Sequence, residues 1–277
     1  MLSLQTPRDC LRPLRAGAIL GVPAGVALAW LAIAGISGIA VLPVAADVPP
    51  LGQSAEGDAQ IATSLATMLR AGRTVVSRNQ DRINDPKLGN KGLDGKTVPA
   101  EAVSIYREAT GVDPLSIDPK SRHGRLIRIQ MDSIVEVIDA HQQTINRQGV
   151  GFKGFIPAVF GRLVNEAFGR RATGDAEMKV TAPPQLIRNA KVQPDGWELA
   201  VIQDKLLSSA WAKDQPFTAV TQLKGKVAHR TVVPEYYGSS CLACHGSPKG
   251  EIDITGYPKE GAGEGDLGGV ISITLYR

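Results

Sequence analysis

Apolar residues recur at helical spacing through the first half of the chain. Ile61, Leu65 and Leu69 begin such a stripe, and the turn-forming residues Asn84–Asp85–Pro86 end it. A second long helix is expected within residues 118–148, where apolar side chains step by four and three positions. The pattern therefore predicts long helices across residues 55–170.

The periodicity changes to that of short strands after residue 175. Val227, His229, Thr231 and Val233 alternate with their neighbours, as expected for a half-buried strand. Other β-type runs occupy residues 178–181, 217–223 and 270–276. Helices followed by antiparallel strands predict an α+β fold, with the sheet-rich part at 175–277.

The N-terminal region has the features of an export signal. Three arginines precede a charge-free run from Ala16 to Ala46, and Val44–Ala45–Ala46 resembles a signal-peptidase site. The run is also long enough to span a bilayer, so residues 1–46 are either a removed signal peptide or an uncleaved membrane anchor. Both interpretations place residues 47–277 outside the cytoplasm, in the periplasm or anchored on its side of the inner membrane.

Charge gives no indication of a nucleic-acid partner. The formal net charge is +4, and subtracting the three Arg and one Asp of residues 1–46 leaves +2 for the remainder. A nucleic-acid-binding domain would carry a marked basic patch or stripe. We expect no nucleic-acid partner.

The most specific chemical signal is Cys241–Leu242–Ala243–Cys244–His245, the C-x-x-C-H attachment motif of a c-type haem. In such a motif the two thiols add to the haem vinyl groups, and the histidine binds the iron from the proximal side. The sequence therefore predicts one covalent haem c held by Cys241 and Cys244, with His245 as an iron ligand.

Two other interpretations of the cysteine pair are a zinc site and a redox dithiol. A zinc site would need further ligands, but the only other cysteine is Cys10, and the remaining histidines, His123, His141 and His229, lack zinc-site spacing. A redox dithiol is the stronger alternative, although the adjacent histidine has no role in one. The exported context favours haem.

Several residues are candidates for the surroundings of a haem. His141 lies on the apolar face of the 118–148 helix and is either a core residue or a distal iron ligand. Phe155 and Tyr237 suit an apolar pocket wall. Arg188 and Arg230 are either partners of the haem propionates or ordinary structural arginines.

Four segments in order strengthen the haem interpretation: Gly151–Ala158, Ile187–Ala190, Pro194–Glu198 and Cys241–Gly246. Together they resemble the exported c-type haem domains long catalogued as a domain of unknown function, which are similar to PAS sensor domains in fold. The resemblance covers most of residues 55–277.

The resemblance implies a PAS-like antiparallel sheet flanked by helices, a single haem and a sensory or redox role. Some relatives have a cysteine near the end of the first long helix that acts as a second axial ligand. Here that stretch, Val75–Gln80, contains no thiol. We expect the distal position to be open, or filled by His141, His229 or Met68 in that order of preference.

These observations favour a monohaem protein that senses redox state or a small ligand. The alternative is a periplasmic electron-transfer cytochrome without a sensory role, for which two strong iron ligands are expected. An enzyme is less favoured, because no acid–base set is identifiable. The expected partners are haem, the membrane if residues 1–46 are retained, and a redox or signalling protein.

Overall fold

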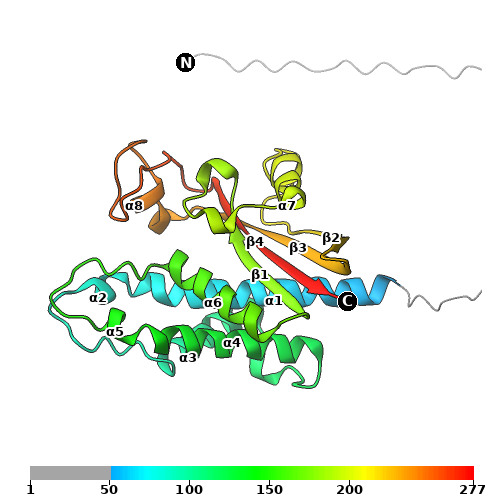
Figure 1. Ribbon diagram of the computed structural model, residues 1–277, viewed down its shortest axis with the longest axis horizontal. Coiled ribbons are helices and arrows are strands. Elements are labelled where there is room, and N and C mark those ends of the chain that lie inside the picture. The colour runs from blue at the N-terminus through cyan, green and yellow to red at the C-terminus, as the bar shows by residue number, and fades with distance from the viewer. Residues whose placement is uncertain (1–50) are drawn as a thin grey trace, which may run out of the picture. The chain divides into compact units, whose positions relative to one another are not determined.

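The computed structural model describes residues 51–277, and helices precede a four-stranded antiparallel sheet in it (Figure 1). This confirms the predicted mixture of helices and antiparallel strands. The expectation of an export signal or anchor at residues 1–46 lies outside the described residues. Within residues 51–277, no helix combines the length and hydropathy required to cross a bilayer.

The helices are α1 (Leu51–Arg78), α2 (Gln80–Asn84), α3 (Thr97–Thr110), α4 (Arg122–Ala140), α5 (Gln142–Ile145), α6 (Pro157–Arg171), α7 (Gly196–Val201) and α8 (Leu242–His245). The local sequence explains where two of these helices begin. The Ser121 side chain accepts a hydrogen bond from the Gly124 N–H at the start of α4, and Pro157 occupies the first turn of α6.

The helix predicted within residues 118–148 is divided at His141. The backbone of His141 leaves the helical region, and its Nδ1 lies 2.7 Å from the carbonyl oxygen of Val137. This contact of a side chain with the preceding turn accompanies the end of α4. The short helix α5 then begins at residue 142.

The strands are β1 (Ala176–Thr181), β2 (Phe217–Leu223), β3 (Lys226–Tyr236) and β4 (Leu267–Tyr276), in the order β1-β4-β3-β2. Strand β3 continues two residues past Pro234, although proline is a residue at which a strand is expected to end. Pairing with β2 stops at Val232, and the Pro234 carbonyl accepts a hydrogen bond from Arg70 instead of from a strand. Proline is tolerated where a strand has lost its neighbour on one side.

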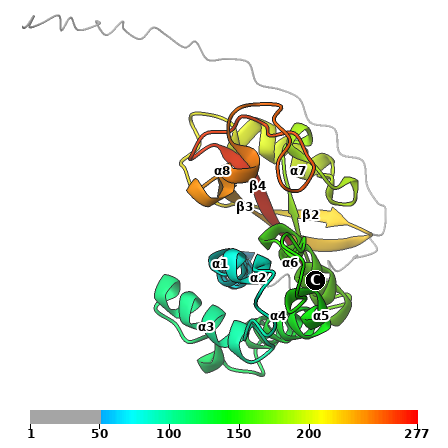
Figure 2. The same cartoon turned by 90° about the vertical axis from the view of Figure 1, so that its left-hand side faces the viewer.

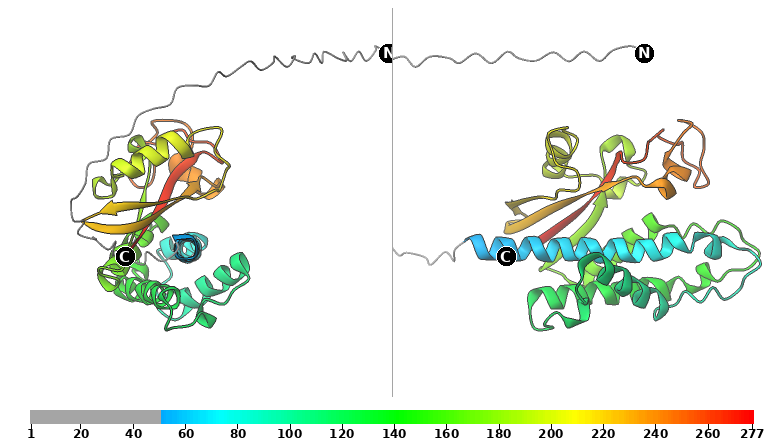
Figure 3. Two further views of the ribbon diagram at one scale, coloured as in Figure 1. Left: turned by 90° about the vertical axis from the view of Figure 1, so that its right-hand side faces the viewer. Right: turned by 180° about the vertical axis from the view of Figure 1, so that it is seen from behind.

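The elements form layers. Helices α1 and α6 pack on one face of the sheet, and α3 and α4 lie beyond them (Figures 1 and 2). Helix α7 lies over the opposite face of the sheet, as the two views of Figure 3 also show. The short helix α8 follows the end of β3 and lies near the C-terminal half of α1.

Two apolar clusters fill the spaces between these layers. The larger one joins the helices to the sheet face formed by Val233, Ile271, Ile273 and Leu275. The smaller one lies under α7 and contains residues such as Val232 and Val270 from the other face. Alternate residues of β3 and β4 thus face opposite clusters, as the period of a strand requires.

Candidate haem-attachment site

The Cys241–His245 motif folds as a short helical segment directly after β3. A 3₁₀ turn over Ser239–Cys241 leads into α8. Residues three apart lie on the same face of a helical turn, so Cys241 and Cys244 share a face. Both thiols are free and partly buried. The backbone therefore presents two adjacent thiols with an imidazole next to them.

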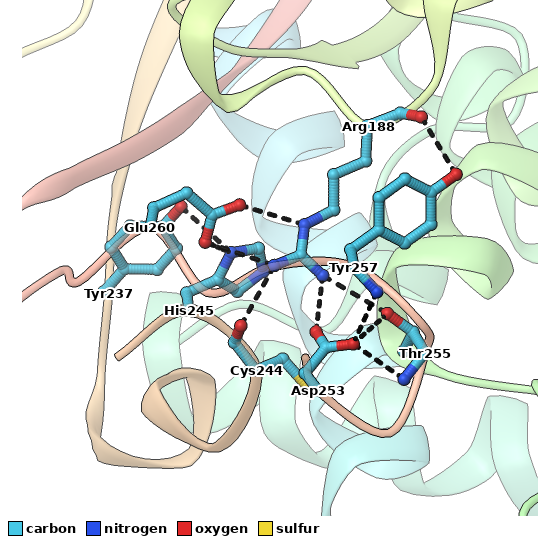
Figure 4. A network of polar contacts seen from close by, with 8 residues as sticks. All are labelled: Arg188, Tyr237, Cys244, His245, Asp253, Thr255, Tyr257 and Glu260. Carbon is cyan, nitrogen blue, oxygen red and sulfur yellow. Dashed lines mark hydrogen bonds and ion pairs between the residues drawn. The ribbon is translucent and has the colours of Figure 1, made fainter. Parts of the chain in front are cut away.

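His245 is oriented by the chain on both sides of the motif. Its Nδ1 lies 2.8 Å from Oε2 of Glu260 (Figure 4). The Tyr237 ring stacks on the imidazole at 4.8 Å between centroids, and its hydroxyl is 3.4 Å from the same nitrogen. A carboxylate at Nδ1 fixes the proton there and leaves the lone pair on Nε2.

Arg188 holds this arrangement together. Its guanidinium donates to both carboxylate oxygens of Glu260, to the side chains of Asp253 and Thr255, and to the carbonyl oxygen of Cys244 (Figure 4). Five N–H groups thus meet five acceptors, which is the full capacity of an arginine. The side chain is committed to the loop and has no donor left for another anion.

The loop after the motif folds back so that Glu260 can reach His245. The Gly261 and Ala262 N–H groups donate to the carbonyls of Gly246 and His245. At the tip of the loop, the buried Asp253 carboxylate accepts hydrogen bonds from the Thr255 backbone and hydroxyl. These contacts make residues 246–262 a defined support for the imidazole.

The local electrostatics keep Glu260 charged. Burial raises its pKa, but hydrogen bonds from Arg188 and His245 outweigh this effect, so the pKa lies below its ordinary value. Burial, together with the nearby charge of Glu260, raises the pKa of Tyr237 to about 12. Burial also raises the pKa of the Cys244 thiol. At neutral pH the surroundings of His245 therefore include the Glu260 carboxylate, the neutral Tyr237 phenol and the protonated Cys244 thiol.

A second ion-pair group joins this region to α1. Arg70 and Arg73 both bind the Glu235 carboxylate, and Arg70 also donates to the Pro234 carbonyl at 2.6 Å. The Glu235 carboxylate is the main cause that raises the pKa of Arg73, and the nearby Cys241 makes a smaller contribution. The end of β3 is thus fixed to α1 immediately before the motif.

Of the four predicted pocket residues, the structure brings two to the motif. Tyr237 stacks on His245 itself, and the Arg188 guanidinium contacts the Cys244 carbonyl and Glu260. Arg230 lies on the α7 side of the sheet and pairs with Asp195 and Glu198. Phe155 is a core residue that packs against His141 and Phe160.

The other three histidines of the chain lie away from the motif. Figures 1 and 2 place α5, which follows His141 directly, on the far side of α1 and α6 from α8. His229 precedes Tyr236 by seven strand residues, which correspond to about 23 Å. His123 bonds to Ser64, which lies about 13 Å along α1 from Arg73. The structure therefore does not bring His141 or His229 to His245.

Sequence reasoning missed Glu260, Asp253 and Glu235. The spacing between Glu260 and His245 has no local period, and only the folded loop brings them together. A carboxylate in the loop after a C-x-x-C-H motif is a signal to look for, because ligating histidines usually donate their second N–H to such a group.

The donor set fits a covalently attached haem. The two thiols share a face, His245 has its Nδ1 occupied and its Nε2 available, and Glu260 supplies the outer hydrogen bond that orients a ligating imidazole. Within residues 51–277, no cluster of three or more His, Cys, Asp or Glu side chains is arranged to hold a metal ion.

In a comparison with known families, the sequence profile of the Tll0287-like domain aligns with residues 55–275. The chain belongs to the Tll0287-like family. The matched region of the Tll0287-like domain includes α1, the sheet and the whole Cys241–His245 motif. No curated protein matches the chain, and no solved structure does so either.

Proposed function

We propose that this protein is an exported monohaem c-type protein that senses redox state or a small ligand through its haem. Cys241 and Cys244 would hold the haem, and His245 would bind the iron on the proximal side. When bound, the haem supplies a one-electron couple and a site for small axial ligands. The observation that carries the proposal is the bond from His245 Nδ1 to Glu260 beside two free thiols.

The residues of the chain would tune this centre through the proximal side. Glu260 orients His245 and keeps its Nδ1 proton in place, and Arg188 positions Glu260. Tyr237 covers one face of the imidazole. Outer hydrogen bonds and burial are the means by which a protein adjusts a redox centre.

The sensory interpretation is preferred over a plain electron carrier because of the positions of the other histidines. His123, His141 and His229 all lie away from the motif, so none of them supports a second histidine ligand. A centre with a weak or open distal position binds small molecules, whereas two strong ligands favour electron transfer alone. The antiparallel sheet flanked by helices agrees with a PAS-like sensor domain.

The position of the motif also suits signal transfer. It follows a strand whose end is fixed to α1 through Glu235, and α1 is the element that adjoins the N-terminal region. We include in the proposal an exported or membrane-anchored location and a redox or signalling partner. Changes at the motif would reach the partner through α1.

Spectroscopy of the ferrous protein with and without carbon monoxide tests the sensory role. Prompt formation of a carbon monoxide complex supports a ligand-accessible distal side. A spectrum that carbon monoxide does not change, together with a reversible one-electron couple, would assign the protein to electron transfer. The covalent haem itself is tested separately by extraction.

A further inference from the structure

The two edges of the sheet differ in how they are protected. Strand β1 forms one edge and β2 forms the other (Figure 2). The β1 edge carries the charged residues Glu177 and Lys179, and the 3₁₀ turn Ala190–Val192 contacts it. The Lys179 ammonium group also donates to the Gln193 carbonyl oxygen at 3.0 Å. Charged side chains and a covering segment are two means by which proteins prevent an edge strand from pairing with another chain.

Strand β2 has neither kind of protection. Residues 217–223 contain no charged residue and no proline, and they include a phenylalanine, a valine and two threonines, which favour strands. All seven residues pair with β3 without a bulge, and in the described part of the chain β2 pairs with no other strand. Val220, at the midpoint of β2, is 50% exposed. A regular, uncharged edge of this kind is a template for a further strand.

The sequence of β2 is complementary to itself in the antiparallel direction. A two-fold axis through Val220 would align all seven residues of one copy with those of another. The facing pairs are then Phe217 with Leu223, Thr218 with Gln222, Ala219 with Thr221, and Val220 with its own copy. The bulky apolar side chains at the two ends of the strand meet each other, a hydroxyl meets an amide, and no like charges are opposed.

This alignment also continues the apolar cluster under α7. The Phe217 ring packs there against the rings of Trp197 and Trp211, at 6.1 and 5.7 Å between centroids. Leu223 lies on the same face of β2 as Phe217, because residues two apart along a strand share a face. The pairs of Phe217 with Leu223 would therefore join the α7 clusters of the two copies across the axis.

We propose that β2 is a dimerisation edge, and that its occupant is β2 of a second copy of this chain. The two four-stranded sheets join into one antiparallel sheet of eight strands. A two-fold contact of this kind closes after two copies, and the edges that remain are the protected β1 strands.

The interface is separate from the haem-attachment site, and the proposal does not depend on the haem. Val220 pairs with His229, which precedes Tyr236 on β3 by about 23 Å. Dimerisation through β2 therefore leaves the Cys241–His245 motif accessible. Failure of this proposal would leave the haem proposal intact, and the reverse also holds.

Sedimentation equilibrium of the full chain tests the proposal. We expect a monomer–dimer equilibrium with a Kd of about 10 µM. The variant Val220→Lys places two ammonium groups next to each other at the axis and should raise this Kd about tenfold or more. Leu207→Lys is the matched control, because Leu207 is 51% exposed but lies in the segment after α7 and not on β2. It should leave the Kd unchanged.

A mixture of two variants tests the position of the axis. Val220→Glu alone should dimerise as poorly as Val220→Lys. The two proteins together should form a heterodimer, because opposite charges then meet at the axis. Absence of this heterodimer, when both variants are folded by circular dichroism, would overturn the proposal.

Two further results would overturn it. One is a wild-type chain that is monomeric at about 100 µM, which would show that a second copy does not occupy the edge. The other is a Val220→Lys protein that dimerises as tightly as the wild type, which would place the dimer contact elsewhere. If the charged variants fail to fold, Val220→Cys should form a disulfide-linked dimer on oxidation, whereas Leu207→Cys should not. A folded Val220→Cys protein that forms no such link would also overturn the proposal.

Discussion

Nδ1 of His245 and Oε2 of Glu260 lie 2.8 Å apart, although the two residues are separated by a complete loop of the chain. Arg188 in turn binds both oxygens of Glu260. The imidazole is therefore hydrogen-bonded to a carboxylate whose charge is partly neutralised. We therefore expect substitutions of Glu260 and of Arg188 to shift the midpoint potential of the haem-loaded protein in opposite directions.

Replacement of Glu260 by Gln is expected to raise the midpoint potential of the haem protein. The carboxylate makes the imidazole a stronger electron donor and so favours the oxidised iron. A neutral amide removes that effect. The measurement is a spectroelectrochemical titration, with Glu264→Gln as control because Glu264 is an exposed glutamate of the same loop. An unchanged or lower potential in Glu260→Gln would contradict the assigned role.

Replacement of Arg188 by Gln is expected to shift the potential in the opposite direction, to lower values. Without the guanidinium, the carboxylate of Glu260 carries its full charge next to His245. The buried Asp253 also loses its ion-pair partner, so the double variant Arg188→Gln/Asp253→Asn should be measured as well. If the Glu260 and Arg188 variants shift the potential in the same direction, the effect is a general loss of structure.

The sequence was sufficient to identify the Cys241–His245 motif. It did not reveal Glu260 and Arg188 as the residues that orient His245. The C-x-x-C-H spacing is local, and the alternation at residues 227–233 correctly predicted a strand leading into it. Glu260 and Arg188 meet the motif only through the folded loop, so no periodicity marks them. For Arg230 the sequence left two roles open, a partner of a haem propionate or a structural arginine. The strand period places it on the α7 face, where it pairs with Asp195.

Replacement of Gly268 by Ala is expected to disturb the stacking of Tyr237 on His245. A Cβ at residue 268 would lie 2.5 Å from the Tyr237 ring, so the ring must move. We expect a loss of about 1–3 kcal/mol in the free energy of unfolding, typical of overpacking. Gly238→Ala is the control, since a Cβ there meets nothing within 4 Å and its φ of −94° suits any residue. Equal stability of the two variants would contradict this account.

His229 predicts a dependence of stability on pH. The side chain is 1% exposed, and neither ring nitrogen has a hydrogen-bond partner. Burial is the main cause that lowers the pKa of His229. The nearby Asp58 raises this pKa, whereas the charges of Arg277 and Arg122 lower it further. The folded protein therefore resists protonation at His229, and its free energy of unfolding should fall as the pH drops below about 6.5.

The variant His229→Leu isolates this contribution. Leucine removes the unpaired nitrogens, so we expect equal or greater stability than wild type at about pH 7.5 and a smaller loss between about pH 7.5 and pH 5. Urea unfolding at both pH values measures this. The pKa of His123 is also lowered by burial, but His123 is present in both the wild-type protein and the variant and contributes equally to the two. A loss in the variant as large as in wild type would exclude His229 as the cause.

The central claim is that Cys241 and Cys244 hold a haem covalently. The most direct measurement is acid–acetone extraction of the protein matured with the c-type cytochrome machinery, followed by a pyridine haemochrome spectrum of the residue. The account predicts that the haem stays with the polypeptide and gives the shifted spectrum of saturated thioether links, and that Cys241→Ala/Cys244→Ala loses it. Complete extraction of haem from the wild-type protein, or its absence, would contradict the claim and leave the cysteines as a dithiol.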